Sequence, residues 1–399
     1  MPAPPATLPA TLPATLPATL PATLRALARY FLTLGTVGFG GPVALVERMR
    51  RDLHERRGWY TEEEYNEGLA LAQLAPGPLA AQLAIYLGWV RAGISGATVA
   101  GACFVLPSFV MVVALAGIYV RFGGLPWMTG AFYGVGASVI AVIASSAWRL
   151  IRKTAGRDPL LWGIVGANAG LTAWSEREVV WVVAASGILV LLVRLRPRAD
   201  VTTLAGFAGP SWLLTGLHGE APARMLATIL GFFAKAGTVV FGSGLAIVPF
   251  LHGSTVQQLH WLTERQFLDA VAVSMITPGP VVITVAFIGY LVAGPLGAVA
   301  AAIGVFLPVY VVVLLVARGF RRAVRNPHLK AAVAGVTAAA TGAIAGAVIV
   351  LGRRALVDGV AVLVCASTLA VILFARRVPE PLLMLAAGVV GLLMRGGGA

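Results

Sequence analysis

The chain has 399 residues, and only 12% of them are charged, about half of the roughly 25% found in ordinary soluble domains. Hydrophobic residues make up 58% of the sequence, which excludes a water-soluble globule or a disordered protein for most of its length. The 30 Lys and Arg residues exceed the 16 Asp and Glu residues, so the net charge is +14. This basic excess lies mainly between apolar runs, as in the cytoplasmic loops of membrane proteins, and we expect no nucleic-acid partner.

Residues 1–24 form a low-complexity arm, in which Pro-Ala-Thr-Leu is repeated five times in tandem from Pro5 to Leu24. Proline at every fourth residue prevents an α-helix, so the arm is predicted to be disordered. It lacks the basic segment and the apolar core of a cleavable signal peptide. We expect this N-terminus to lie in the cytoplasm.

Nine apolar runs have about the length that a helix needs to cross a bilayer. They are 95–120, 126–148, 158–174, 178–194, 201–217, 295–317, 331–351, 356–374 and 380–394. Four further apolar segments, at about 26–46, 61–90, 224–249 and 263–292, are interrupted by Gly and Pro. These four are predicted to be broken or re-entrant helices. The expected fold class is therefore an all-α polytopic membrane protein.

The sequence is internally duplicated. Gly35-Thr36-Val37 recurs as Gly237-Thr238-Val239, and Pro76-Gly77-Pro78 recurs as Pro278-Gly279-Pro280, both 202 positions later. Leu106-Pro107 recurs as Leu307-Pro308 after 201 positions, so one residue has been lost in between. We expect two homologous transporter repeats, 25–198 and 224–399, joined by a connecting span at 199–223, because many transporters are built in this way.

The charge pattern indicates that the two halves have inverted topology. Segment 48–58 carries five Arg residues, whereas its counterpart 250–260 carries no Lys or Arg. Segment 318–330 also carries five basic residues, whereas its counterpart near 117–126 carries only Arg121. Because short cytoplasmic loops are rich in Lys and Arg, equivalent loops are expected on opposite sides of the membrane. Arg353 and Arg354 fall outside the cell in this scheme and count against it.

Two capping boxes mark helices that end at the two Pro-Gly-Pro motifs. Thr61 with Glu64, and Thr263 with Gln266, each start a helix of about fourteen residues. A proline pair around a glycine cannot continue a helix, and Pro78 is expected at the first position of a new one. A second pair of breaks is predicted at Phe39-Gly40-Gly41-Pro42 and Phe241-Gly242-Ser243-Gly244.

Such breaks at membrane depth are tolerated only inside protein or along a wet cavity. The helix that restarts there offers free N–H groups and its positive dipole end to an anion. The candidate substrate site therefore comprises the four breaks and neighbouring polar side chains: Gly40, Gly41, Pro42, Gln73, Pro76, Gly77, Pro78, Gln82, Lys235, Gly242, Ser243, Gly244, Thr277, Pro278, Gly279, Pro280 and Thr284. The alternative is that Gly and Pro only kink the helices or allow close packing.

Three ionisable residues have candidate roles. Lys235 lies in an apolar stretch and would neutralise an anion, although a lysine near a helix end also snorkels to the interface. Its counterpart is Thr33. Glu67 and Asp269 are equivalent to each other, nine residues before their Pro-Gly-Pro motifs, and form a candidate proton relay. Pairing with neighbouring Arg residues is the alternative for both.

Other chemistry is not indicated by the sequence. Cys103 and Cys365 lie in apolar runs, and the five His residues are scattered. No Ser/His/Asp arrangement or P-loop is present, so we expect no metal, no cofactor and no enzymatic activity.

The quoted motifs resemble a known family. Phe39-Gly40-Gly41-Pro42, Trp59, the run from Gln73 to Pro78 and the run from Gln82 to Trp89 are similar to the first domain of the chromate ion transporter family. Lys235-Ala236-Gly237, Phe241-Gly242-Ser243-Gly244 and the runs Gln266–Asp269 and Thr277–Pro280 resemble its second domain. The resemblance covers 25–395, the two-domain long-chain form.

The resemblance implies export of chromate from the cytoplasm, coupled to the proton motive force, in a bacterial inner membrane. Sulfate or another tetrahedral oxyanion stays open as the substrate, and a homodimer stays open as the assembly. Two other classes of function stay open as well. One is a passive anion channel, and the other is a membrane enzyme or a scaffold tethered through the arm.

Overall fold

The computed structural model describes residues 23–39, 41–122, 125–175, 180–194, 222–239, 244, 247–317, 327–375 and 378–395. The first half contains α1 (Leu24–Val37), α2 (Gly41–Met49), the π-helical turn η1 (Arg50–Arg56), α3 (Glu62–Leu74), α4 (Leu79–Phe122), α5 (Pro126–Ala155), α6 (Pro159–Ser175) and α7 (Val180–Arg194). The second half contains α8 (Pro222–Val239), α9 (Ile247–Leu251), η4 (His252–Gln258), α10 (Glu264–Ile276), η5 (Val281–Ile283), α11 (Thr284–Ala317), α13 (Pro327–Ala355), α14 (Gly359–Phe374) and α15 (Glu380–Arg395).

The predicted fold class is confirmed, since every regular element in the described ranges is helical. Within the part of the chain that the structure describes, four helices are long and apolar enough to cross a membrane: Leu79–Phe122, Trp127–Ala155, Val281–Ala317 and Lys330–Ala355. Residues 182–194, 359–374 and 380–394 form shorter apolar helices. The predicted span 201–217, most of the 199–223 connector and residues 1–22 of the arm lie outside the described residues.

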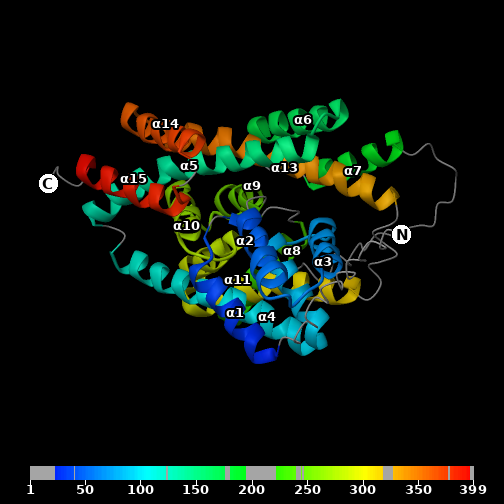
Figure 1. The fold of residues 1–399 in the computed structure, drawn as a ribbon. Helices are drawn as coiled ribbons and strands as arrows, with labels where there is room; N and C mark the ends of the chain where they lie inside the picture. The colour runs from blue at the N-terminus through cyan, green and yellow to red at the C-terminus, as the bar shows by residue number, and fades with distance from the viewer. Residues whose placement is uncertain are drawn as a thin grey trace, which may run out of the picture.

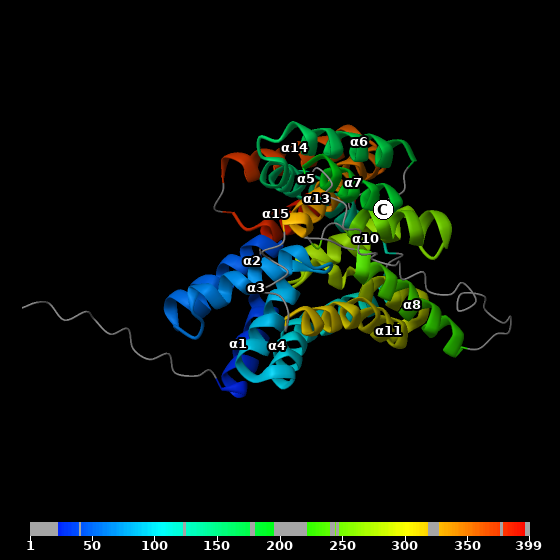
Figure 2. The ribbon, with the colours of Figure 1, turned by 90° about the vertical axis from the view of Figure 1, so that its right-hand side faces the viewer.

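The helices form two layers that are interlocked between the halves (Figure 1). One layer holds α5, α6, α7, α13, α14 and α15, and the other holds α1 to α4 with α8 and α11, as the second view also shows (Figure 2). The two last helices of each half pack mainly on the long helix of the other half. Thus α6 and α7 contact α13, and α14 and α15 contact α5.

The same pairs of elements meet in both halves, as expected for a structural duplication. Helix α1 packs on α4 as α8 packs on α11, and the equivalent helices α4 and α11 cross each other. At the first contact Gly35 of α1 lies against the carbonyl of Phe104, and a Cβ there would be 2.4 Å from that oxygen. Gly237 makes the same approach to the carbonyl of Val305, again at 2.4 Å. Neither position has room for a side chain.

The long helix after each Pro-Gly-Pro break consists of two arms, and the first, short arm packs back against the second. Non-helical torsions at Ala92 and Gly93 divide α4, and those at Ala293 and Gly294 divide α11. Across the first kink a Cβ on Gly88 would lie 2.2 Å from the carbonyl oxygen of Gly96. Gly289 and Gly297 repeat this contact. The segments predicted to start at 95 and 295 are therefore the second arms of helical hairpins.

The basic residues of 149–157, 194–198 and Arg376-Arg377 predict that these segments also lie in the cytoplasm. Two ion pairs join helix ends in or beside them. Arg149 donates to Glu380 at 2.8 Å, and Arg194 binds Asp158. The Arg194 guanidinium holds the pKa of the Asp158 carboxyl below its ordinary value. At the other predicted side Arg354 binds Glu264, which also contacts His252 at 2.8 Å. Arg354, which did not fit the charge rule, thus has a carboxylate partner in the second half's capping segment.

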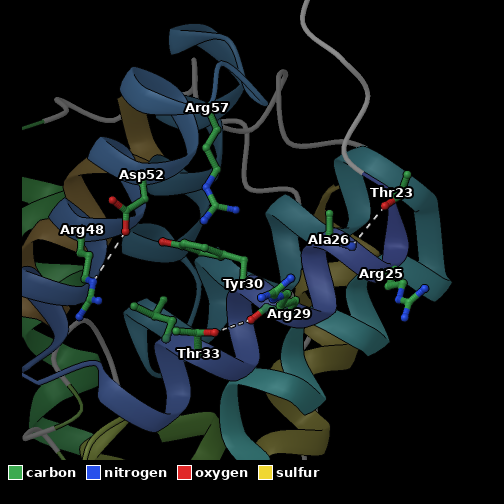
Figure 3. A pocket seen from close by; sticks show the side chains of 10 residues that line it. Thr23, Arg25, Ala26, Arg29, Tyr30, Thr33, Arg48, Asp52 and Arg57 are labelled. Atoms are coloured by element: carbon green, nitrogen blue, oxygen red, sulfur yellow. Dashed lines mark hydrogen bonds and ion pairs between the residues drawn. The ribbon is translucent and has the colours of Figure 1, made fainter.

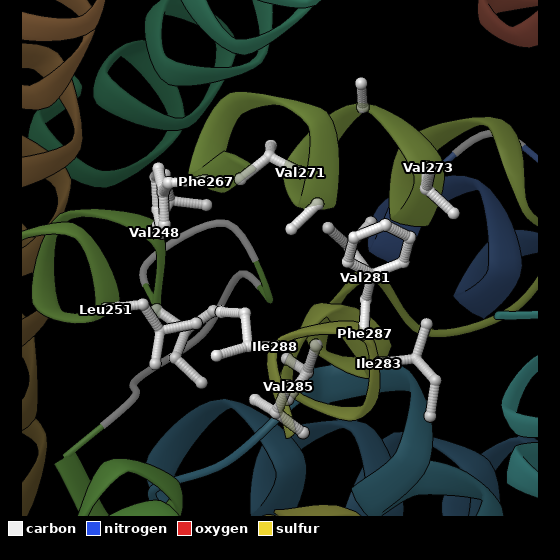
Figure 4. Close-up of a cluster of buried hydrophobic side chains, with 14 of the residues drawn as sticks. Val248, Leu251, Phe267, Val271, Val273, Val281, Ile283, Val285, Phe287 and Ile288 are labelled. Atoms are coloured by element: carbon white, nitrogen blue, oxygen red, sulfur yellow. The ribbon is translucent and has the colours of Figure 1, made fainter. Parts of the chain in front are cut away.

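The largest core surrounds the second break. Residues of α10, including Phe267, Val271 and Val273, pack against Val281, Ile283 and Phe287 of the returning segment (Figure 4). Val248 and Leu251 of α9 complete this cluster. The apolar packing fixes the backbone on both sides of the break, and this positions the candidate site.

Candidate functional site

The two predicted capping boxes and breaks are present. Thr61 accepts from the backbone N–H of Glu64 at 3.1 Å, and Thr263 accepts from that of Gln266 at 3.3 Å. Helices α3 and α10 each have 13 residues and end just before Pro-Gly-Pro. The next helix begins at Leu79 with Pro78 immediately before it, whereas the second half restarts with the 3-10 turn Val281–Ile283.

Both motif glycines have positive φ, at 134° for Gly77 and 103° for Gly279. A side chain at either position would be strained by its backbone conformation. The first turn of each following helix has backbone N–H groups that no intrahelical carbonyl accepts. These groups face the break, where the helix dipole favours negative charge.

Each break packs against the crossing helix of the opposite half, at equivalent positions. A Cβ on Gly77 would lie 2.9 Å from both γ-carbons of Val309 on α11. A Cβ on Gly279 would lie 1.9 Å from Ser108 Oγ on α4. Ser108 and Val309 are 201 positions apart, each directly after the repeated Leu-Pro pair. The two breaks are therefore held at the crossing of α4 and α11.

The second Pro-Gly-Pro and the turn that follows it lie beside the two Gly-rich segments. The backbone N–H of Gly279 donates to the carbonyl of Gly38, just after α1, at 2.9 Å. Gly244 is buried, and a Cβ there would lie 3.1 Å from the side chain of Val282. The described ends of both Gly-rich segments thus lie next to the second break.

Gln82 and Thr284 occupy equivalent places after the two breaks, and both are buried. The Gln82 amide donates to the carbonyls of Pro76 at 2.6 Å and Ala75 at 3.2 Å, which lost their helical partners at the break. Its Oε1 is buried without a hydrogen-bond partner in the described structure. Thr284 Oγ1 lies 2.7 Å from the carbonyl oxygen of Val281 and 2.6 Å from Ser274 Oγ. Both side chains stabilise the broken backbone.

The remaining predicted residues lie in varied surroundings. The Thr277 hydroxyl donates to the carbonyl of Val273 at 2.7 Å, within its own helix. Gln73 and Lys235 are exposed, and Gly41 and Pro42 are half-buried. Pro78, Pro278 and Pro280 are buried, and Pro76 is half-buried. Gly40, Gly242 and Ser243 lie outside the described residues.

The two candidate relay carboxylates each accept a hydrogen bond from a tyrosine. Tyr86 donates to Glu67 at 3.2 Å, and Tyr119 donates to Asp269 at 2.7 Å. Glu67 is half-buried, whereas Asp269 is 4% exposed. Asp269 also lines a cavity of about 240 Å³ whose charged members include Glu264, Arg265 and Arg354. A buried carboxylate beside a polar cavity can exchange a proton with water.

Sequence reasoning missed Ser108, Gly38 and Tyr119. Ser108 follows a repeated Leu-Pro pair, but its counterpart is Val309, so the repeat gave no polar signal. Tyr119 reaches Asp269 from the other half of the chain, and this contact depends on the tertiary fold. In the described ranges no three His, Cys, Asp or Glu side chains gather in a way that could hold a metal ion.

Comparison with known proteins adds the decisive observation. The model of the chromate transporter family matches residues 25–191 and again 227–392, which are the two halves. The chain belongs to the chromate transporter family. A chromate transport protein of Cupriavidus metallidurans is 53% identical over 369 residues and covers 92% of each chain. A probable chromate transport protein of Synechococcus elongatus is 51% identical, over 92% of this chain and 94% of its own length. A chromate transport protein of Pseudomonas aeruginosa is 34% identical over 335 residues. No solved structure matches.

The resemblance noted on the sequence motifs is thus confirmed at the level of the family. These relatives are named as transport proteins, which is consistent with a role in transport. The repeat boundaries of the family match also coincide with the duplicated helical pattern.

Proposed function

We propose that this member of the chromate transporter family is a secondary active transporter that exports chromate from the cytoplasm by alternating access. The observation that supports this most is the meeting of the two Pro-Gly-Pro breaks with the crossing of α4 and α11. Interrupted helices paired by internal symmetry are the usual substrate sites of transporters with repeats. The relatives named for chromate transport supply the substrate class.

The site in this proposal is built from backbone. Helix N-termini after Pro78 and Pro280 direct N–H groups at the anion, and Gly77 and Gly279 let the chain approach it closely. Gln82, Thr277 and Thr284 hold the broken backbone in place, as their hydrogen bonds indicate. We also assign to the site the residues of the two Gly-rich breaks, Gly40, Gly41, Pro42, Gly242, Ser243 and Gly244, and the exposed Gln73 near the end of α3. Lys235 neutralises part of the charge of the dianion.

Proton coupling is assigned to Asp269 and Glu67. Asp269 is buried, bonded to Tyr119 and next to a polar cavity, so its protonation depends on which side of the protein is open to water. Helix α10 carries both Asp269 and the start of the second break. A change in the charge of the Asp269 carboxylate would therefore be transmitted along α10 to the substrate site.

The membrane arrangement follows from the charge pattern. The basic segments 48–58 and 318–330 lie in the cytoplasm, together with the N-terminal arm, and the two halves are inverted. The host membrane is the bacterial plasma membrane.

Uptake of chromate into inverted membrane vesicles tests the proposal, because their cytoplasmic face is outward and export appears as accumulation. An imposed proton gradient should drive accumulation, with sulfate present as a competitor. Equal uptake with and without the gradient would favour the passive anion channel. Preferential accumulation of sulfate would make sulfate the substrate.

A further inference from the structure

The strongest feature outside the central breaks is a basic cavity on the first half. Its volume is about 660 Å³, and it is lined from α1 by Arg25, Arg29, Tyr30 and Thr33, and from the α2–η1 wall by Arg48, Asp52 and Arg57 (Figure 3). The lining contains four Arg residues and a single Asp. The space exceeds the roughly 30 Å³ share of one water many times, so it has room for an anion with part of its hydration shell.

Most of this positive charge is not neutralised within the protein. Asp52 is shared, because Arg48 lies 3.7 Å and Arg56 3.3 Å from its carboxylate. Arg57 stacks over the rings of Tyr30 at 5.0 Å and Trp59 at 4.7 Å, which fixes its guanidinium beside the cavity. In the described structure Arg25 and Arg29 form no ion pair or hydrogen bond through their guanidinium groups.

Tyr30 supplies a second, independent observation. Its side chain extends from α1 toward Asp52 and Arg48, and the residue is only 6% exposed. Its hydroxyl has no hydrogen-bond partner among the described residues. A buried hydroxyl without a partner costs about 1–3 kcal/mol, so an acceptor in the cavity would recover this energy.

The second half does not repeat the cavity, although its helices are equivalent. The counterparts of Tyr30 and Arg48 are Phe232 and Phe250, whose rings stack at 5.7 Å. Trp261, the counterpart of Trp59, packs on Phe232 at 5.3 Å. The counterparts of Arg25, Arg29 and Arg57 are Ala227, Gly231 and Leu259. The cationic cavity is therefore a feature of one half, the half whose basic segment is expected in the cytoplasm.

Helix α1 connects this cavity to the central site. Thr33 and Leu34 line the cavity, and one turn later Gly38 accepts the hydrogen bond from Gly279 of the second break. Arg48 also donates to the carbonyl of Val37 at 3.1 Å, so it links the cavity wall to the end of α1.

We propose that this cavity is a capture site for a tetrahedral oxyanion dianion on the cytoplasmic side, from which the substrate passes along α1 to the central breaks. Arg25, Arg29 and Arg57 supply the charge, and the Tyr30 hydroxyl donates to an anion oxygen. This inference rests on the proposed function for the identity of the substrate. The phosphate of a lipid headgroup has the same chemistry and is the competing source.

The test compares variants in proteoliposomes of phosphatidylcholine alone and with added cardiolipin. Arg29→Ala and Tyr30→Phe should raise the KM for chromate, by about tenfold and about threefold, and leave the maximal rate nearly unchanged. Arg51→Ala is the matched control, because the substitution removes an equal charge from η1 in the same half, at a residue that does not line the cavity. Its KM should equal that of the wild type.

The outcomes separate the two proposals. An unchanged KM in Arg29→Ala, with normal wild-type transport, overturns the capture site and leaves the proposed function standing. A KM effect that appears only with cardiolipin assigns the cavity to a lipid headgroup and also overturns it. If the wild type does not transport chromate at all, equilibrium binding of radiolabelled chromate in phosphatidylcholine decides. Binding that is lost in Arg29→Ala supports the cavity, and absence of binding refutes it.

Discussion

Gly279 lies at a position of the second break where a Cβ atom would have no room. In Gly279→Ala the new Cβ would lie 1.9 Å from Ser108 Oγ and 3.0 Å from Ser108 Cβ, where ordinary contact begins at 3.4 Å. The Ser108 hydroxyl must therefore rotate away and the two segments must separate by about 0.4 Å, or they must separate by about 1.5 Å if the hydroxyl stays in place. The positive φ of 103° adds about 1–2 kcal/mol of backbone strain, and the overpacking adds about 1–3 kcal/mol. A displacement of this size at a binding site costs on the order of a hundredfold in rate.

The clash and the backbone strain can be separated with second-site variants. Ser108→Ala removes the oxygen but leaves the Cβ at 3.0 Å, and Ser108→Gly removes both. Chromate transport should therefore rise in the order Gly279→Ala, then Gly279→Ala with Ser108→Ala, then Gly279→Ala with Ser108→Gly. Gly156→Ala is the control for strain alone, because Gly156 has φ of 51° and open space around its Cβ position.

The assay is initial chromate uptake into inverted vesicles, normalised to the amount of inserted protein. Gly156→Ala should transport like the wild type, and Gly279→Ala should fall to about a hundredth of it. Wild-type uptake by Gly279→Ala would refute the reasoning, since the break could not then be packed against α4 as described. Failure of Ser108→Gly to restore any transport would leave the strain, and not the clash, as the cause.

Three further predictions concern the polar residues around the breaks. Asp269→Asn should abolish gradient-driven chromate accumulation while downhill chromate exchange persists. Tyr119→Phe should reduce accumulation by a smaller factor, because it removes one hydrogen bond to the Asp269 carboxylate. Loss of both accumulation and exchange in Asp269→Asn would indicate a structural role for Asp269. Gln82→Met should lower the free energy of unfolding of the purified protein by about 1–3 kcal/mol, because the carbonyls of Ala75 and Pro76 lose the Gln82 amide as their donor. An unchanged free energy of unfolding would contradict these hydrogen bonds. Lys235→Ala should weaken chromate transport more than the control Lys153→Ala, which removes an equal charge from an exposed position at the end of α5, and equal effects would assign Lys235 to the interface.

The sequence predicted well what depends on local rules. The capping boxes at Thr61 and Thr263 and the Pro-Gly-Pro motifs determine where α3 and α10 begin and end, and the structure confirms both. The duplication also predicted which helices would be equivalent. These features are set by residues within one or two turns of each other, so their spacing along the chain is informative.

The features that the sequence did not predict depend on contacts between segments that are distant in the chain. No local pattern shows that Gly279 meets Ser108, or that α14 and α15 pack on α5 of the other half. The turns at Ala92-Gly93 and Ala293-Gly294 fall between the predicted segments that end at about 90 and 292 and those that start at 95 and 295, but no local pattern shows that the two arms pack back on each other there. The roles of Gln82 and Thr284 in holding broken backbone likewise became visible only from their hydrogen-bond partners.

Chromate accumulation in inverted vesicles under an imposed proton gradient tests the central claim most directly. The account predicts that the wild type concentrates chromate above its external level, that an uncoupler abolishes this accumulation and that sulfate competes for it. Chromate that only equilibrates across the membrane, at the same rate with and without the gradient, would contradict a coupled exporter and indicate a passive anion pathway.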